Sequence, residues 1–207
     1  MAVVAQQMSP VNSTNVGVRQ AAVLQLDLCN YTVLASSVAS QQLAAHIHGI
    51  FSAFDSILSD TSAKSNGVFK MDTIGDAYVS AAWLDGEDSE QAQRRNGEIC
   101  QSLLDVAGRM IDAIALYNES HGMKLECRVG IDAGPVTAGM LGRLQPRFHL
   151  VGLPVFGSAK LESQARRNEV NMSDAVAALL SRRPFGTSQV REREPNEASV
   201  NRNALLY

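Results

Sequence analysis

The chain has 207 residues, of which 45% are hydrophobic and 19% charged, and its formal net charge is −3. This is enough material for one domain with a real core, and the absence of a basic excess argues against a nucleic-acid partner. Its three cysteines, Cys29, Cys100 and Cys127, are odd in number and widely spaced, which favours neither a disulfide framework nor a zinc site. No run approaches the roughly 20 apolar residues that span a bilayer. We expect the chain to be cytoplasmic, either as a separate protein or as the intracellular domain of a larger membrane protein.

The first half of the chain predicts a strand, a long helix and a hairpin. Residues 1–19 are polar and predict a flexible leader, and the alternation over 21–27 predicts a strand. From about Ser40 apolar residues recur every three or four positions, as on one face of a helix. Two short strands are predicted next, at 68–71 and 77–83.

The second half predicts another long helix and several shorter elements. Residues 85–97 are polar and predict a connection, and an apolar stripe from Ile99 to Tyr117 predicts a helix. Three strands and two helices are then predicted, namely strands at 125–134, 136–142 and 147–152 and helices at 155–166 and 173–182. Residues 184–207 predict a polar tail with a candidate edge strand at its end, 203–207. The paired arginines, such as Arg166-Arg167, are interpreted as solvated surface.

The order strand, helix, strand, strand, helix, strand is that of the split βαβ, ferredoxin-like arrangement. We therefore predict an α+β fold: an antiparallel sheet with two helices on one face, extended by extra strands and helices. The domain is assigned to residues 20–183, between the leader and the tail. This arrangement supports many functions and does not identify one by itself.

One carboxylate lies at a glycine turn, in the stretch "FKMDTIGDAYVS", where Asp76 follows Gly75. A tight hairpin explains this stretch alone, since Gly-Asp is an ordinary two-residue turn. A metal site is the alternative, because Asp27 ends the first strand and a split βαβ sheet places that strand beside the hairpin. Paired carboxylates with open positions suit Mg²⁺, which keeps substrate phosphates among its ligands. After Asp27 the chain leads into a helix start, where free N–H groups can cradle a polyphosphate.

Four blocks of the sequence resemble the catalytic domain of class III nucleotidyl cyclases, the adenylyl and guanylyl cyclase homology domain, over roughly residues 20–180. They occur in the family's order: "LDLCNYTVLAS", "FKMDTIGDAYVSAAW", "CRVGIDAGPVTAGMLG" and "RFHLVGLPVFGSAKLES". The resemblance implies conversion of ATP or GTP to a 3′,5′-cyclic nucleotide and pyrophosphate, with two Mg²⁺ or Mn²⁺ ions. It implies that Asp27 and Asp76 hold the metal. It also implies a triphosphate loop made of Leu28, Cys29, Asn30, Tyr31 and Thr32.

The chain departs from this family on the side of the site that a second cyclase domain provides. Active sites of the family lie between two domains, one giving the metal carboxylates and the other a transition-state Asn and Arg and the base-reading residues. Here the Asn position is Phe156, and the Arg position is Lys160, which lacks the planar fork of arginine and stays a weak catalytic candidate. The base-reading positions are Leu153 and Asp72. Donors aimed at developing charge are typically worth roughly 10²–10³ in rate each, so their loss matters.

Within the triphosphate loop, Asn30 replaces the family's Gly. This change is tolerable if the position needs a left-handed backbone, because Asn is among the side chains that visit that region. The C-terminal part of the chain also lacks the glycine- and lysine-rich stretch that would give the family's second phosphate-binding lysine.

Three hypotheses follow. The first is the metal-binding half of a heterodimeric cyclase, with a partner domain supplying Asn, Arg and the base-reading residues; a homodimer is possible but is expected to be inactive or very weak. The second is a pseudocyclase, a regulatory or structural dimerisation module. The third, a polymerase- or diguanylate-cyclase-like palm, is disfavoured because the turn has the sequence "IGDAY".

Overall fold

The computed structural model describes residues 17–64, 67–141, 144, 147–181 and 200–201. Its elements in chain order are β1 (Gly17–Cys29), α2 (Tyr31–Ser37), α3 (Ser40–Lys64), β2 (Phe69–Ile74), β3 (Ala77–Leu84), α4 (Glu90–His121), β4 (Glu126–Leu141), β5 (Arg147–Val151), α5 (Leu153–Gln164), β6 (Val170–Met172), α6 (Asp174–Ser181) and β7 (Val200–Asn201). In this part of the chain, no helix combines the length and the apolar character needed to cross a membrane.

The strands form one mixed sheet in the order β2-β3-β1-β4-β6-β7, with β5 paired to β4. β1 is antiparallel to both β3 and β4, and β2 is antiparallel to β3. The order β2-β3-β1-β4 is that of the split βαβ arrangement, so the predicted α+β fold is confirmed. β6 extends this sheet parallel to β4, and β7 is parallel to β6.

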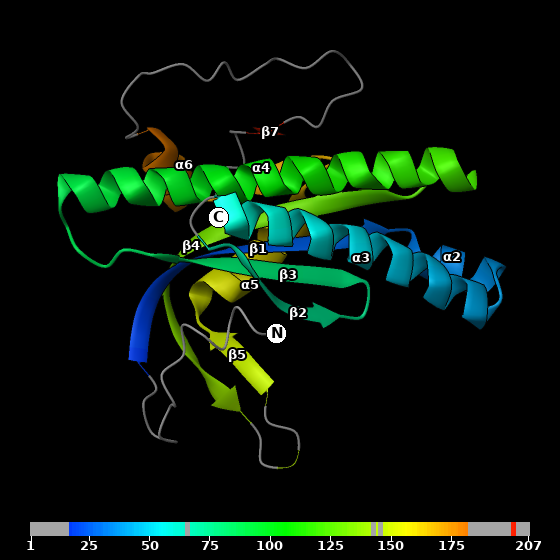
Figure 1. Ribbon diagram of the computed structural model, residues 1–207, viewed down its shortest axis with the longest axis horizontal. Coiled ribbons are helices and arrows are strands. Elements are labelled where there is room, and N and C mark those ends of the chain that lie inside the picture. The colour runs from blue at the N-terminus through cyan, green and yellow to red at the C-terminus, as the bar shows by residue number, and fades with distance from the viewer. Residues whose placement is uncertain (1–16, 65–66, 142–143, 145–146, 182–199, 202–207) are drawn as a thin grey trace.

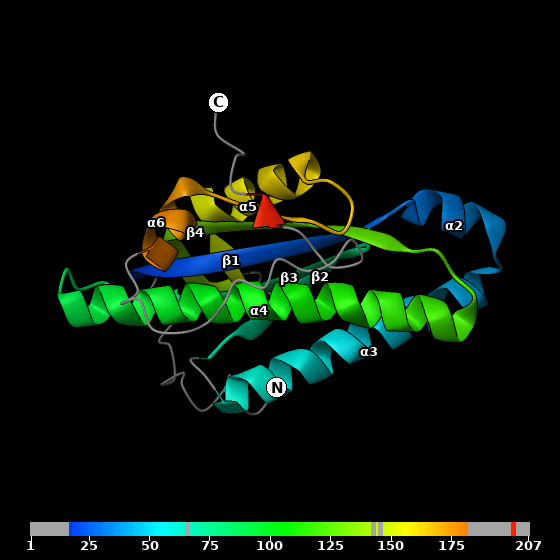
Figure 2. The same cartoon turned by 90° about the horizontal axis from the view of Figure 1, so that it is seen from above.

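Helices cover both faces of the sheet. α3 and α4 lie on one face, as predicted, and α5 lies on the other (Figures 1 and 2). The core under α3 and α4 contains most of the large buried side chains, among them Leu24, Leu26, Phe54, Tyr78 and Leu103. A smaller apolar cluster, which includes Val23, Val79 and Val136, lies on the other face. The two clusters follow from strands whose successive side chains point to opposite faces.

Two predicted boundaries in the second half are wrong. α4 begins at Glu90, so most of the polar segment 85–97 is helical; Ser89 caps this helix by accepting a hydrogen bond from the Ala92 amide at 3.2 Å. The runs predicted as two strands around Pro135 form the single strand β4. Proline is tolerated there because it lies between the stretch of β4 that pairs with β6 and the stretch that pairs with β5.

The ends of the domain also differ from the prediction. β1 begins at Gly17, so residues 17–19 belong to a strand and not to the leader. The segment 203–207, predicted as an edge strand, lies outside the described residues. Residues 200–201 form β7, which pairs with β6 at the sheet edge. A helix start after Asp27 was predicted, and α2 begins there at Tyr31. The strand β6 was not predicted, because three residues are too few to show a period.

Candidate functional site

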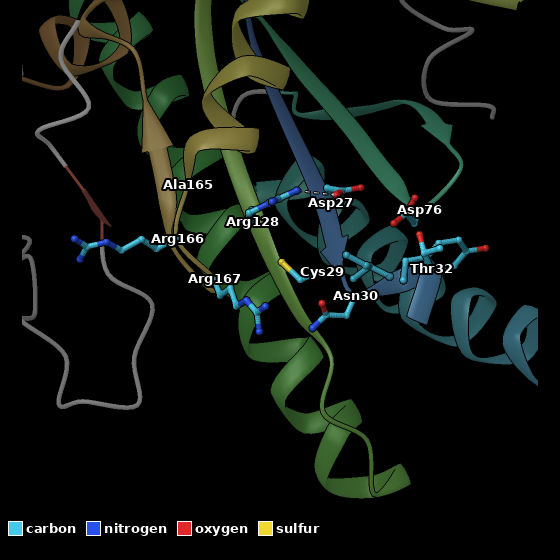
Figure 3. A pocket seen from close by; sticks show the side chains of 11 residues that line it. Asp27, Cys29, Asn30, Thr32, Asp76, Arg128, Ala165, Arg166 and Arg167 are labelled. Atoms are coloured by element: carbon cyan, nitrogen blue, oxygen red, sulfur yellow. Dashed lines mark hydrogen bonds and ion pairs between the residues drawn. The ribbon is translucent and has the colours of Figure 1, made fainter. Parts of the chain in front are cut away.

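A cavity of about 540 Å³ opens where β1 ends. It is lined by residues from β1, the loop into α2, the β2–β3 turn, β4 and the loop after α5, namely Asp27, Leu28, Cys29, Asn30, Tyr31, Thr32, Asp76, Arg128, Ala165, Arg166 and Arg167 (Figure 3). The structure therefore brings together the two predicted metal ligands and the whole predicted triphosphate loop. Carboxylates and guanidinium groups share the cavity, so both signs of charge are available to a ligand.

Asp27 and Asp76 meet because β1 pairs with β3. Asp27 lies opposite Ala77 in that ladder, and Asp76 is the residue before Ala77, in the hairpin turn. Gly75 has φ of 64°, so the glycine takes the left-handed position of a two-residue turn. The turn is thus a tight hairpin, as its sequence predicted, and it also presents Asp76 to the cavity.

The electrostatics of Asp27 suit a bound cation. Burial raises the pKa of the Asp27 carboxyl above its ordinary value, the nearby Asp76 carboxylate raises it further, and Arg128 opposes the shift. A divalent cation between the two carboxylates would relieve both the repulsion and the cost of burial.

Two carboxylates are a sufficient protein ligand set for the expected ion. Among the described residues, no group of three or more His, Cys, Asp or Glu side chains is placed to hold a metal. Mg²⁺ does not need such a group, since it is commonly bound by one or two carboxylates together with water and substrate phosphates. The residues present fit an ion that is completed by a polyphosphate substrate.

Arg128 and Glu162 extend this site toward α5, and sequence reasoning missed both. Arg128 lies opposite Asp27 in the β1–β4 ladder; its Nη2 donates to Asp27 Oδ2 at 3.2 Å, and its Nε donates to Glu162 Oε1 at 2.7 Å. Glu162 is buried, which raises the pKa of its carboxyl against the opposing effect of Arg128. The guanidinium thus fixes the position of Asp27 relative to helix α5.

The close approach of α5 to β4 makes that bridge possible. At Gly130, a side chain would collide with the Ser158 carbonyl oxygen and the Glu162 amide nitrogen, so only glycine lets the helix lie this near. The available signal was Gly130, two residues after Arg128, which suggests a close backbone approach in a strand. It could not name Glu162 as the partner.

The triphosphate loop has the backbone expected of it. Asn30 has φ of 63° and ψ of 19°, so the position is left-handed, which is the condition under which asparagine can replace glycine there. α2 starts at the next residue, and the Leu34 amide donates to the Asn30 carbonyl oxygen at 3.0 Å. Leu28 and Cys29 are both buried, Leu28 within the core, so their side chains are not free to bind phosphate. Burial also raises the pKa of the Cys29 thiol.

The remaining predicted site residues lie elsewhere. Leu153 and Phe156 are 79% and 71% exposed at the start of α5, and Lys160 is exposed one turn further along. Asp72 lies on β2, where its Oδ1 accepts a hydrogen bond from the next amide, that of Thr73, at 2.8 Å. None of these four residues lines the cavity. In a single chain the predicted site is therefore divided into a metal side and a separate surface.

Arg166 and Arg167 were interpreted as solvated surface, and both are exposed, but they also line the cavity. Sequence reasoning missed them because the turn after α5 returns to the end of β1 only through the tertiary fold.

Comparison with known proteins gives one family. The profile described as "Adenylate and Guanylate cyclase catalytic domain" matches residues 15–202. The receptor-type guanylate cyclase gcy-10 of Caenorhabditis elegans is 28% identical over 160 residues, and human atrial natriuretic peptide receptor 2 is 28% identical over 156 residues. These alignments cover 77% and 74% of this chain but only 14% of each relative, so the chain spans about one-seventh of their length.

Solved structures show the same fold. The guanylate cyclase domain of RhGC from Catenaria anguillulae, in complex with GTP, superimposes with a TM-score of 0.66 at 25% identity, covering 79% of this chain and 84% of that one. The adenylyl cyclase CyaB from P. aeruginosa has a TM-score of 0.66 at 16% identity, covering 81% and 83%. The second likeness bears on the fold alone.

Proposed function

The chain belongs to the adenylate and guanylate cyclase catalytic domain family, and we propose that it is the metal-binding half of a dimeric nucleotidyl cyclase. The observation that carries this is the split of the site. Asp27 and Asp76 meet in a cavity with residues 28–32, whereas Phe156 and Lys160, which the resemblance aligns with the transition-state positions, lie on a separate, exposed surface. Phe156 has no side-chain donor, so a complementary domain must supply the Asn and Arg.

The proposed reaction is an internal phosphoryl displacement. The ribose 3′ oxygen attacks the α-phosphorus and loses its proton, the bond from that phosphorus to the bridging oxygen breaks, and pyrophosphate leaves. Mg²⁺ or Mn²⁺ held by Asp27 and Asp76 would supply Lewis-acid stabilisation of the attacking and leaving oxygens. Arg128 on β4 holds the Asp27 carboxylate on the neighbouring strand β1 through their ion pair. The N–H groups at the start of α2, which lack partners within the helix, would face the triphosphate.

The partner surface is proposed to include the start of α5. Leu153 and Phe156 are large apolar side chains that stand mostly in solvent, and Val151 beside them is 51% exposed. Clustered exposed apolar side chains are typical of protein interaction sites. A homodimer would place Phe156 and Lys160 opposite the metal carboxylates of each site, so we propose a heterodimer as the active form.

The proposed substrate is ATP or GTP. Two of the proteins named above, gcy-10 and the RhGC domain, are guanylate cyclases by name, which makes GTP the first to test. Several relatives are receptors, which supports a domain on the cytoplasmic side of a larger membrane protein.

A pseudocyclase is the second candidate, and the exposed Phe156 is the observation that favours it. An aromatic side chain at the Asn position packs well in an interface and contributes nothing to transition-state charge. In that case the domain would dimerise and regulate without turnover.

The test is cyclic-nucleotide formation by the purified chain with Mn²⁺ or Mg²⁺ and ATP or GTP. The chain is assayed alone and mixed with a cyclase domain that carries Asn and Arg but has both of its own metal aspartates replaced by asparagine. Activity only in the mixture, lost with Asp76→Ala, supports the metal-binding half. If the mixture makes no cyclic nucleotide although the two domains are shown to associate, the result supports the pseudocyclase. If the chain alone is as active as the mixture, both candidates are contradicted.

A further inference from the structure

Arg167 lies on the wall of the cavity that faces the triphosphate loop. It belongs to the turn between α5 and β6, and in Figure 3 its side chain extends toward Cys29 and Asn30. The neighbouring Arg166 also touches the cavity, but its side chain extends in the opposite direction (Figure 3).

An ion pair orients Arg167. Its Nη1 donates to Glu126 Oε2 at 2.6 Å, and Glu126 lies opposite Cys29 in the β1–β4 ladder. A guanidinium has five N–H donors in a planar fork, so one bond to Glu126 leaves other donors for a second anion. The Arg167 side chain is 57% exposed, which leaves those donors accessible from the cavity.

The turn that carries Arg167 is attached firmly to β4. Asn168 has φ of 57°, its amide donates to the Cys127 carbonyl oxygen at 2.6 Å, and its Oδ1 accepts from the Cys127 amide at 3.1 Å. The Val129 amide then donates to the Glu169 carbonyl oxygen at 3.1 Å. These bonds hold the backbone that follows Arg167 against β4, so this segment has little conformational freedom to lose when a ligand binds.

We propose that Arg167, oriented by Glu126, binds the phosphate chain of the nucleotide within this chain's own cavity. The ligand chemistry is a magnesium-bound pyrophosphate or triphosphate group, with the metal at Asp27 and Asp76 and the anionic oxygens toward Arg167. This inference rests on the proposed function, which places a nucleotide in the same cavity.

The experiment measures binding of inorganic pyrophosphate with Mg²⁺ to the purified chain by calorimetry, without any partner. Arg167→Ala is expected to raise the Kd about tenfold, the effect of losing one charge-assisted hydrogen-bonding partner at a partly exposed site. Arg167→Lys keeps the charge without the fork and is expected to lie between the two. Arg95→Ala is the control, because this exposed arginine of α4 does not line the cavity, and it is expected to stay within about twofold of the wild type.

Two results would overturn the inference: no pyrophosphate binding by the wild-type chain, or the same Kd for wild type and Arg167→Ala. If the ion pair with Glu126 were only structural, Arg167→Ala would lower the melting temperature and leave the Kd unchanged. A different result would reject the proposed function alone. Pyrophosphate binding that depends on Arg167, with no cyclic nucleotide from any mixture, would keep this inference and reject the cyclase.

Discussion

The end of β1 and the start of α5 are the two halves of one predicted site, and they differ in how their side chains are supported. At the end of β1, Asp27 is held by Arg128, which is held in turn by the buried Glu162. At the start of α5, Leu153 and Phe156 stand in solvent. A site whose charged groups are supported by their neighbours is built to bind a charged ligand, and a bare apolar surface is built to meet another protein.

This contrast defines what a second domain must bring. The end of β1 offers carboxylates, guanidinium groups and helix-start amides, which are proposed to bind a metal and a phosphate chain. The start of α5 offers neither the amide of asparagine nor the fork of arginine, so we expect it to stabilise developing charge on a nucleotide held by a partner only weakly, through Lys160. In the proposed heterodimer, one composite site would be complete and the other degenerate.

The largest effect is expected from a substitution of a proposed metal ligand. Asp76→Asn in an active mixture is expected to lower the rate of cyclic-nucleotide formation by about 10³-fold or more, because a metal-bound transition state loses one of its two protein carboxylates. The chain itself should fold normally, since the change removes a charge that repels Asp27. A rate assay with a thermal melt checks both, and a variant retaining a tenth of the activity would remove Asp76 from the metal site.

The next largest effect is expected from introducing the Asn and Arg that the start of α5 lacks. Phe156→Asn combined with Lys160→Arg is expected to raise the cyclase activity of the chain alone by about 10²-fold or more, since donors aimed at developing charge are typically worth roughly that much each. Both side chains are exposed, so the fold should tolerate the changes. The assay offers ATP and GTP with Mn²⁺. A double variant that dimerises and remains as inactive as the wild type would show that these positions are not what limits turnover.

A smaller effect compares two ion pairs. Arg128→Ala leaves the buried Glu162 without its partner and is expected to cost about 2 kcal/mol of folding free energy, roughly 30-fold in the folding equilibrium. Arg167→Ala breaks a pair whose side chains are 57% and 33% exposed, and should cost less than about 1 kcal/mol. Urea unfolding of both variants measures the difference. Equal losses would contradict the view that burial of Glu162 makes the Arg128 bridge structurally important.

The smallest effect concerns the partner surface. Leu153→Ser is expected to weaken association with a partner domain about tenfold, because it removes most of the apolar area that a leucine buries in an interface. The melting temperature of the isolated chain should not change, because Leu153 is largely exposed and lies outside the core. Analytical ultracentrifugation gives the dimer Kd. A matched change at Leu116, which is 66% exposed on α4, is the control and should leave association unaltered.

Sequence patterns predicted the features that depend on short stretches. The hairpin at Gly75, the left-handed Asn30 and the convergence of Asp27 with Asp76 each follow from a few neighbouring residues and the strand order. The Arg128–Glu162 bridge was out of reach, because it depends on the register of β1 against β4 and on how closely α5 approaches Gly130. The position of Arg167 was missed for the same reason, since an arginine pair in a polar turn looks like solvated surface until the turn is placed beside β1.

The most direct test of the central claim uses this chain as its own partner. A second copy carries Asp27→Asn, Asp76→Asn, Phe156→Asn and Lys160→Arg, so it can supply only the transition-state side, and the wild type only the metal side. Each copy is assayed alone and in an equal mixture with Mn²⁺ and both nucleotides. The account predicts cyclic nucleotide from the mixture and from neither copy alone. Wild-type chain alone turning over at the rate of the mixture would contradict it.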